Sequence, residues 1–222
     1  MTCSCCTTIG DPAARHFDAT RAQKELRTYQ TSGPGPTTRA LAAGVTAIGP
    51  HTGTLLDIGS GIGVLTLELL KTGFDSATCV DLSAASLEVA RTESLRRGYA
   101  ERISWQQADF AAVAGSVDQA DVVVLDRVVC CYPAFEPLLE QAAAHARQAF
   151  AMSFPRDRWY VRALVNIENV VRRMQGNDFR TFVHPAIAME ALLTNAGLKR
   201  VSRRTTFAWS MDVYARFAAQ KV

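Results

Sequence analysis

Three closely spaced glycines follow an aspartate, in the run Asp57-Ile-Gly59-Ser60-Gly61-Ile-Gly63. Glycine has no Cβ, so the backbone can approach a bound molecule, and a helix that begins after the loop offers free amide hydrogens to a carboxylate or phosphate. The dinucleotide fingerprint requires its third glycine at position 64, where this chain has Val64. The loop therefore indicates a ligand site that does not fit the nicotinamide dinucleotide pattern.

Further aspartates close the next three apolar runs, at Asp81, Asp109 and Asp126. A carboxylate at Asp81 can accept hydrogen bonds from both hydroxyls of a ribose. One at Asp109 can accept from the amino group of an adenine, with Phe110 placed to cover the ring. Each acid taken alone is equally well explained as a helix N-cap or a loop residue. Four acids at successive strand ends beside the glycine loop favour a nucleoside-binding site.

Alternating strands and helices must position these residues. Apolar runs predict strands at 54–58, 77–80, 103–106, 121–125 and 149–153, with helical spacing between them. This order predicts an α/β fold with a doubly wound, mostly parallel sheet, in which ligands bind beyond the carboxyl ends of the strands. Two last strands, 199–206 and 211–217, predict an antiparallel C-terminal hairpin.

The chain is expected to divide into residues 1–50, a cysteine-rich tail with lid helices at 11–30 and 37–48, and a main domain at 51–222. Its 222 residues include 24 Lys and Arg against 21 Asp and Glu, a net charge of +3 that is too small to favour nucleic acid as a partner. No apolar run predicts a transmembrane segment, and no secretory signal is recognised, so a cytoplasmic location is expected. The oligomeric state is left open.

With these motifs, residues 54–153 resemble class I S-adenosylmethionine (SAM)-dependent methyltransferases. The resemblance implies a seven-stranded Rossmann-like sheet, SAM as cofactor, and a glycine loop against the methionine part of SAM. It also implies that Asp81 holds the ribose and that Asp109 meets the adenine. Methyl transfer from a sulfonium relies on alignment and a dry pocket more than on acid–base groups. The predicted cofactor-binding residues are Asp57, Gly59, Ser60, Gly61, Gly63, Asp81, Leu82, Asp109, Phe110 and Asp126.

The acceptor is predicted to be a small molecule methylated on oxygen, nitrogen or sulfur. Two short stretches, one containing Tyr29 and the other Tyr132-Pro133, resemble magnesium-protoporphyrin IX methyltransferases, although those enzymes tend to have His where this chain has Cys131. Tyr29 and Cys131 are predicted to be catalytic, and Arg127 and Tyr132 to contact the substrate. The alternatives are a porphyrin-type carboxyl O-methyltransferase and a non-catalytic module that binds cofactor or metal.

The remaining candidate residues are expected to be mainly structural. The cysteines Cys3, Cys5, Cys6, Cys130 and Cys131 offer ligands for a soft metal, but their spacing matches no standard pair, so no metal site is predicted. His16 and His184 are expected to pack rather than to act as bases. In a helix predicted over 157–174, Trp159 and Tyr160 are expected to pack between helices. The arginines nearby, Arg156, Arg158 and Arg162, are expected on a solvated face.

Overall fold

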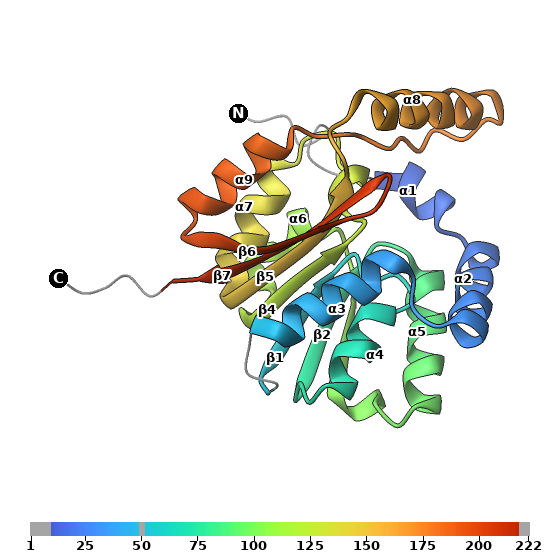
Figure 1. The fold of residues 1–222 in the computed structure, drawn as a ribbon. Coiled ribbons are helices and arrows are strands. Elements are labelled where there is room, and N and C mark those ends of the chain that lie inside the picture. Colours follow the sequence, from blue (N-terminus) through green and yellow to red (C-terminus); the bar gives the residue numbers. More distant parts are fainter. Residues whose placement is uncertain (1–9, 49–51, 218–222) are drawn as a thin grey trace.

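A computed structural model of the chain describes residues 10–48 and 52–217. Seven strands form one sheet in the order β3-β2-β1-β4-β5-β7-β6 (Figure 1). Strands β1 to β5 pair in parallel, and β7 runs antiparallel to both β5 and β6. The predicted fold class is therefore confirmed. The strands are β1 (Thr54–Ile58), β2 (Ser76–Asp81), β3 (Ile103–Gln107), β4 (Ala120–Asp126), β5 (Ala146–Pro155), β6 (Leu198–Thr205) and β7 (Trp209–Arg216).

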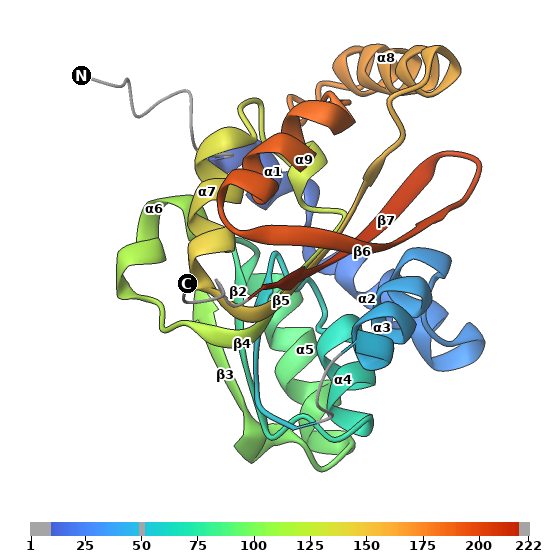
Figure 2. The same ribbon diagram turned by 60° about the vertical axis from the view of Figure 1, so that its left-hand side comes forward.

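Helices cover both faces of this sheet (Figures 1 and 2). One face carries α3 (Pro36–Ile48), α4 (Val64–Lys71) and α5 (Ala84–Arg96). The other carries α6 (Phe110–Val113), α7 (Glu136–His145) and α9 (Ala186–Asn195). Among the described residues, the short 3-10 helices η2 (Ala100–Arg102), η3 (Ala114–Ser116) and η4 (Val129–Cys131) lie in the connections. The order of strands reverses between β1 and β4, and in such sheets a ligand crevice forms at this switch point.

Alternating side chains of the central strands build a core on each face. Val123 and Leu125 of β4 join the cluster beneath α7 and α9, whereas Val122 and Val124 join the cluster beneath α3 and α4. Successive side chains of a strand point to opposite faces, so a strand buried on both faces needs apolar residues throughout. This requirement explains the valine run of β4.

The N-terminal helices differ from the prediction. The continuous helix expected over 11–30 is wrong, because α1 (Gly10–His16) and α2 (Ala19–Ser32) are separate. Asp18 lies between them and accepts a hydrogen bond from the Arg21 amide at 2.9 Å, which makes it the N-cap of α2. Helix α3 packs on the sheet through the buried Leu41 and Val45. The cysteines Cys3, Cys5 and Cys6 lie outside the described residues.

Helix α8 (Trp159–Met174) projects from the end of β5, away from the sheet (Figures 1 and 2). Trp159 at its start is 81% exposed, so the expectation that this side chain packs between helices is wrong. Arg158 and Arg162 are exposed as expected, whereas Arg156 donates to the carbonyl of Thr206 at 3.0 Å. Within the described residues, no helix combines the length and the apolar character needed to cross a membrane.

Candidate active site

The glycine loop leads from the end of β1 into α4 and depends on left-handed backbone at two cavity-lining positions. Gly59 and Gly61 have φ of 65° and 54°. A Cβ on Gly59 would lie 2.5 Å from Cγ2 of Val128, so no larger residue fits there. A Cβ on Gly61 would meet nothing within 4 Å, because this backbone faces open space in the cavity. Gly61 thus presents bare backbone of the kind that a cofactor can approach closely.

Gly63, by contrast, serves packing. It has φ of 75° and immediately precedes α4, and a Cβ there would lie 3.1 Å from the ring of Trp105. Gly63 does not line the cavity. Because Gly63 has no side chain, the start of α4 can approach β3. Direct contact between Gly63 and a cofactor stays a prediction.

Asp57 lies beneath the loop at the carboxyl end of β1 and is buried. Its Oδ2 accepts a hydrogen bond from the hydroxyl of Thr66 at 2.7 Å. Burial raises the pKa of this carboxyl to about 7, and the nearby charges of Asp126 and Asp81 act in the same direction. The site therefore gathers negative charge around the glycine loop, which suits a positively charged ligand.

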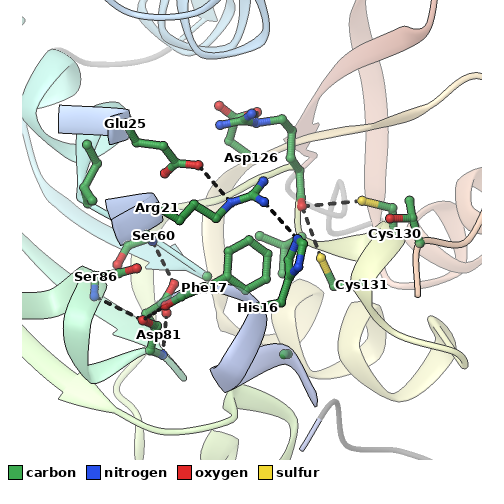
Figure 3. A pocket seen from close by; sticks show the side chains of 18 of the residues that line it. His16, Phe17, Arg21, Glu25, Ser60, Asp81, Ser86, Asp126, Cys130 and Cys131 are labelled. Atoms are coloured by element: carbon green, nitrogen blue, oxygen red, sulfur yellow. Dashed lines mark hydrogen bonds and ion pairs between the residues drawn. The ribbon is translucent and has the colours of Figure 1, made fainter. Parts of the chain in front are cut away.

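Asp81 connects the glycine loop to the turn after β2. Its Oδ2 accepts from the Gly61 amide and its Oδ1 from the Ser83 amide, each at 2.7 Å (Figure 3). Burial raises the pKa of Asp81 above its ordinary value. Each carboxylate oxygen can accept more than one hydrogen bond. Asp81 can therefore still accept from ligand hydroxyls in the cavity, which it lines together with Leu82.

Asp126 ends β4 and joins three elements. Its Oδ2 accepts from the hydroxyl of Thr38 at 2.5 Å, and its Oδ1 accepts from the hydroxyl of Ser153 at 2.6 Å. Ser153 in turn accepts from the Arg127 amide at 2.8 Å. Thr38 on α3 was not predicted, because nothing in its local pattern marks a helix residue whose hydroxyl reaches a strand end 88 positions away.

Asp109 caps a helix. It is the N-cap of α6 and its Oδ1 accepts from the Ala111 amide at 3.1 Å, which confirms the capping alternative at this position. The same oxygen accepts from the hydroxyl of Tyr132 at 2.6 Å. Asp109 does not line the cavity, whereas its neighbours Ala108 and Phe110 do. A contact between Asp109 and adenine stays a prediction.

One cavity of about 1340 Å³ joins these residues. It begins at the glycine loop and the ends of β1, β2 and β4, and it extends beneath α1, α2 and α8 (Figures 1 and 3). All predicted site residues except Gly63 and Asp109 line it. Lining residues that the sequence did not single out as a site include Phe17, Arg21, Val161, Leu164, Val171, Phe179 and Trp209. They come from segments that lack any recognised motif.

Arg127 follows β4 with φ of 65°, and among the described residues it alone has a positive φ without being glycine. Left-handed backbone costs a side-chain-bearing residue about 1–2 kcal/mol, and such strain gathers at functional sites. The side chain is half exposed, and its Nε lies 4.0 Å from Oδ1 of Asp126. The thiols of Cys130 and Cys131 both donate to the Arg127 carbonyl, at 3.5 and 3.6 Å (Figure 3).

Tyr29 is anchored by its hydroxyl to Glu68 on α4. Its hydroxyl donates to Oε1 of Glu68 at 2.5 Å, and the guanidinium of Arg97 lies 4.3 Å from its ring centre. Burial, aided by the carboxylate of Glu68, raises the pKa of Tyr29 well above its ordinary value. Tyr29 lines the cavity with its hydroxyl engaged in this way, so a catalytic role stays a prediction.

The two histidines near the cavity have packing partners. His16 stacks on Phe179 with ring centres 4.3 Å apart, and its Nε2 lies 2.9 Å from the Arg21 guanidinium. Burial, together with the charge of Arg21, lowers the pKa of His16 to about 4, so this ring is neutral at pH 7. Nε2 of His184 lies 2.9 Å from the carbonyl of Tyr132, which holds the turn after η4. The placement of His184 agrees with its expected packing role, whereas His16 packs on Phe179 and also lines the cavity, which was not expected.

A metal site is absent from the described part of the chain, where no three potential ligands among His, Cys, Asp and Glu gather. Cys79 is buried beside Thr66, and burial raises the pKa of its thiol well above the ordinary value. The pKa of Cys130 is raised as well, by its hydrogen bond with Cys131 and by burial. These thiols are therefore protonated at neutral pH, which does not favour metal binding.

Comparisons with known proteins find one family model and several similar solved structures. Residues 55–149 match the family model described as "Methyltransferase domain". The structure resembles magnesium protoporphyrin IX methyltransferase from Synechocystis PCC 6803 with bound S-adenosylhomocysteine (SAH), with TM-score 0.73 and 17% identity over 92% of this chain and 98% of that one. It also resembles an O-methyltransferase family protein from Burkholderia thailandensis, with TM-score 0.71 and 18% identity over 95% of this chain and 64% of that one.

A further similar structure is a putative S-adenosyl-L-methionine-dependent methyltransferase from Methanococcus maripaludis, with TM-score 0.65 and 16% identity over 93% of this chain and 96% of that one. No curated protein sequence matches the chain. The matched stretch is thus similar to a methyltransferase domain, and the fold is shared with solved methyltransferases that hold SAM or SAH. The predicted resemblance to methyltransferases is confirmed over residues 55–149, and the bare backbone at Gly61 fits the predicted cofactor, SAM.

Proposed function

We propose that the chain methylates an oxygen, nitrogen or sulfur atom of a small molecule bound in the outer part of the cavity. The observation that carries this proposal is the continuity of the cavity. It runs from Gly61 and Asp81 at the strand ends to Arg127, Tyr132 and the inner side of α8. One continuous space can thus hold a methyl donor and an acceptor in line, which is the main requirement of a direct displacement.

The strand ends supply the cofactor half of the site. SAM, when bound, supplies a methyl group on a positively charged sulfonium. The carboxylates of Asp81 and Asp126 provide negative charge on this side, beside the partly ionised Asp57, and hydrogen bonds to the protein fix each of them. Fixed charges need no rearrangement during reaction, so this arrangement favours the bound cofactor and its orientation.

The outer half of the cavity supplies the acceptor site. Apolar side chains of α8, Val161, Leu164 and Val171, form part of its wall and exclude water. Arg127 is the cation next to the loop, and its nearest carboxylate oxygen is 4.0 Å away. A guanidinium with this freedom can bind a carboxylate or phosphate on the acceptor. The acceptor proposed is therefore a partly apolar molecule with an anionic group.

Catalytic roles for Tyr29 and Cys131 belong to this proposal and have their own test. Tyr29→Phe removes only the hydroxyl bonded to Glu68, and Cys131→Ser keeps a donor of similar size. A catalytic group lowers kcat by about a hundredfold or more when it is removed. A loss of stability with unchanged kcat would assign Tyr29 or Cys131 a structural role instead.

The direct test has two stages. Calorimetry of the full chain with SAH is expected to show binding at one site, and Asp81→Asn is expected to weaken it. Methyl transfer is then measured with labelled SAM against a panel of small carboxylic acids, phenols, amines and thiols. Product formation that stops with Arg127→Gln supports the acceptor site described above. Cofactor binding combined with transfer only to RNA or protein would overturn the small-molecule proposal.

A porphyrin carboxyl group is a second candidate acceptor. It is favoured by Tyr132 and Pro133, which follow η4 as the resemblance implies, and by the structural likeness to the Synechocystis enzyme. Tyr132 lines the cavity. Methylation of magnesium protoporphyrin IX under saturating SAM would favour this candidate. An enzyme that methylates smaller acids but not this porphyrin would rule it out.

The wider setting of the enzyme is also proposed. We infer an enzyme without a nucleic-acid partner from the net charge of +3. A cytoplasmic location stays a proposal. The proposed division of the chain is unchanged: a cysteine-rich tail with lid helices over 1–50, and a main domain over 51–222. Zinc analysis of protein purified under reducing conditions tests the non-catalytic alternative, because stoichiometric metal would favour it.

A further inference from the structure

Helix α8 carries an exposed apolar stripe that reaches from the cavity mouth to the outer surface, formed by Trp159, Leu164, Ile167, Val170, Val171 and Met174. These six are among eleven large apolar side chains exposed in the described part of the chain. At 3.6 residues per turn they fall within an arc of about 140°. An apolar stripe of this width normally faces a protein core. Here it faces solvent.

The attachment of α8 explains this orientation. Val161 is the one residue of the helix that is buried, and by helical spacing it lies outside the stripe. Tyr160 fixes the start of the helix to the β6–β7 turn, where its ring centre lies 4.9 Å from that of Phe207. Phe207 is itself exposed and extends the apolar surface beyond Trp159. Figures 1 and 2 both show α8 standing away from the sheet.

Arginines outnumber acidic residues on α8 and in the segments next to it. Residues 156–180 contain six arginines against three acidic residues, so their net charge of +3 equals that of the whole chain. Arg162 is paired with Asp157 at 2.7 Å, and Arg172 with Glu168 at 3.2 Å. Arg158 and Arg173 are exposed and make no ion pair within the described residues. Charge complementarity thus points to an anionic surface.

We propose that α8 docks the enzyme on the surface of an anionic lipid bilayer. Helices that lie in the membrane interface combine an apolar face that contains Trp and Leu with a polar face rich in Lys or Arg, and anionic lipids strengthen their binding. Helix α8 has both features. Leu164, Ile167 and Val171 also line the cavity, so docking brings the cavity mouth to the bilayer. This inference does not depend on the identity of the acceptor.

The test is co-sedimentation of the full chain with vesicles of phosphatidylcholine, with and without phosphatidylglycerol. Binding is expected only with the anionic lipid and is expected to weaken as salt is added. Val170→Glu/Met174→Glu changes two stripe residues that do not line the cavity, and it is expected to weaken binding about a hundredfold. Arg158→Gln/Arg173→Gln is expected to weaken binding about tenfold.

Leu95→Glu is the matched control. Leu95 is 70% exposed on α5, far from α8, and its change is expected to leave vesicle binding intact. SAH binding and circular dichroism of each variant show whether it is folded. Absence of wild-type binding to anionic vesicles would overturn the proposal. So would a Val170→Glu/Met174→Glu variant that binds normally, or light scattering showing that the stripe joins two copies or holds another protein instead.

Discussion

The hydroxyl of Tyr132 donates to Oδ1 of Asp109 at 2.6 Å, which ties the segment after β4 to the end of β3. Tyr132→Phe removes this bond and leaves a partly buried carboxylate with one partner fewer. The expected loss of unfolding free energy is about 1–3 kcal/mol. Because the bond holds the acceptor side of the cavity, KM for the acceptor is expected to rise more than the dissociation constant of SAH. Denaturant unfolding and calorimetry measure the two effects.

Tyr214→Phe is the control for this prediction. Tyr214 donates to Oδ2 of the buried Asp212 at 3.2 Å, in a similar pair that does not line the cavity. The Tyr214→Phe variant is expected to have a lower free energy of unfolding and unchanged KM values. Equal effects of the two variants on KM would show that the Tyr132 bond has no specific link to the site.

The sequence predicted the sheet because its strands carry strong local signals. The glycine loop and the acids at successive strand ends mark the switch point between β1 and β4, and the family resemblance that they carry implied SAM as cofactor. The roles of Thr38 and α8 were not predictable, since they depend on how distant elements pack. Trp159 shows the limit most clearly. Its helical spacing predicts an apolar face but does not tell whether that face meets protein or solvent.

Gly61→Ala separates cofactor binding from folding. The new Cβ would meet no protein atom within 4 Å but would enter the cavity, so SAH affinity is expected to fall at least about tenfold. The folding cost is that of left-handed backbone alone, about 1–2 kcal/mol. Gly98→Ala is the matched control, because its φ of 77° imposes the same cost and a Cβ there also meets nothing. Unchanged SAH affinity in Gly61→Ala would contradict the site.

Arg127 allows backbone strain to be separated from side-chain function. Arg127→Gly and Arg127→Ala both remove the guanidinium, but only glycine relieves the φ of 65°. The glycine variant is therefore expected to be more stable than the alanine variant by about 1 kcal/mol. Both variants are expected to raise KM for an anionic acceptor to a similar extent and to leave SAH binding unchanged. Different KM values would attribute the effect to the backbone.

Asp57 is expected to make stability fall as pH rises. Burial raises the pKa of this carboxyl to about 7 in the folded chain, from an ordinary value of 3.8. Between these two values the folded state holds a proton that the unfolded state has lost. Unfolding free energy therefore decreases with pH by up to about 1.4 kcal/mol per unit, and the contribution is fully lost above the folded pKa.

Asp57→Asn removes this titration while keeping an oxygen that can accept from Thr66. Denaturant unfolding from about pH 5 to about pH 8 is expected to show a smaller decrease for the variant than for wild type, so that Asp57→Asn is the more stable protein at the upper end. Other groups titrate in both proteins and cancel in the difference. Parallel curves for the two proteins would show that Asp57 stays ionised throughout, and that its burial does not hold a proton beneath the glycine loop.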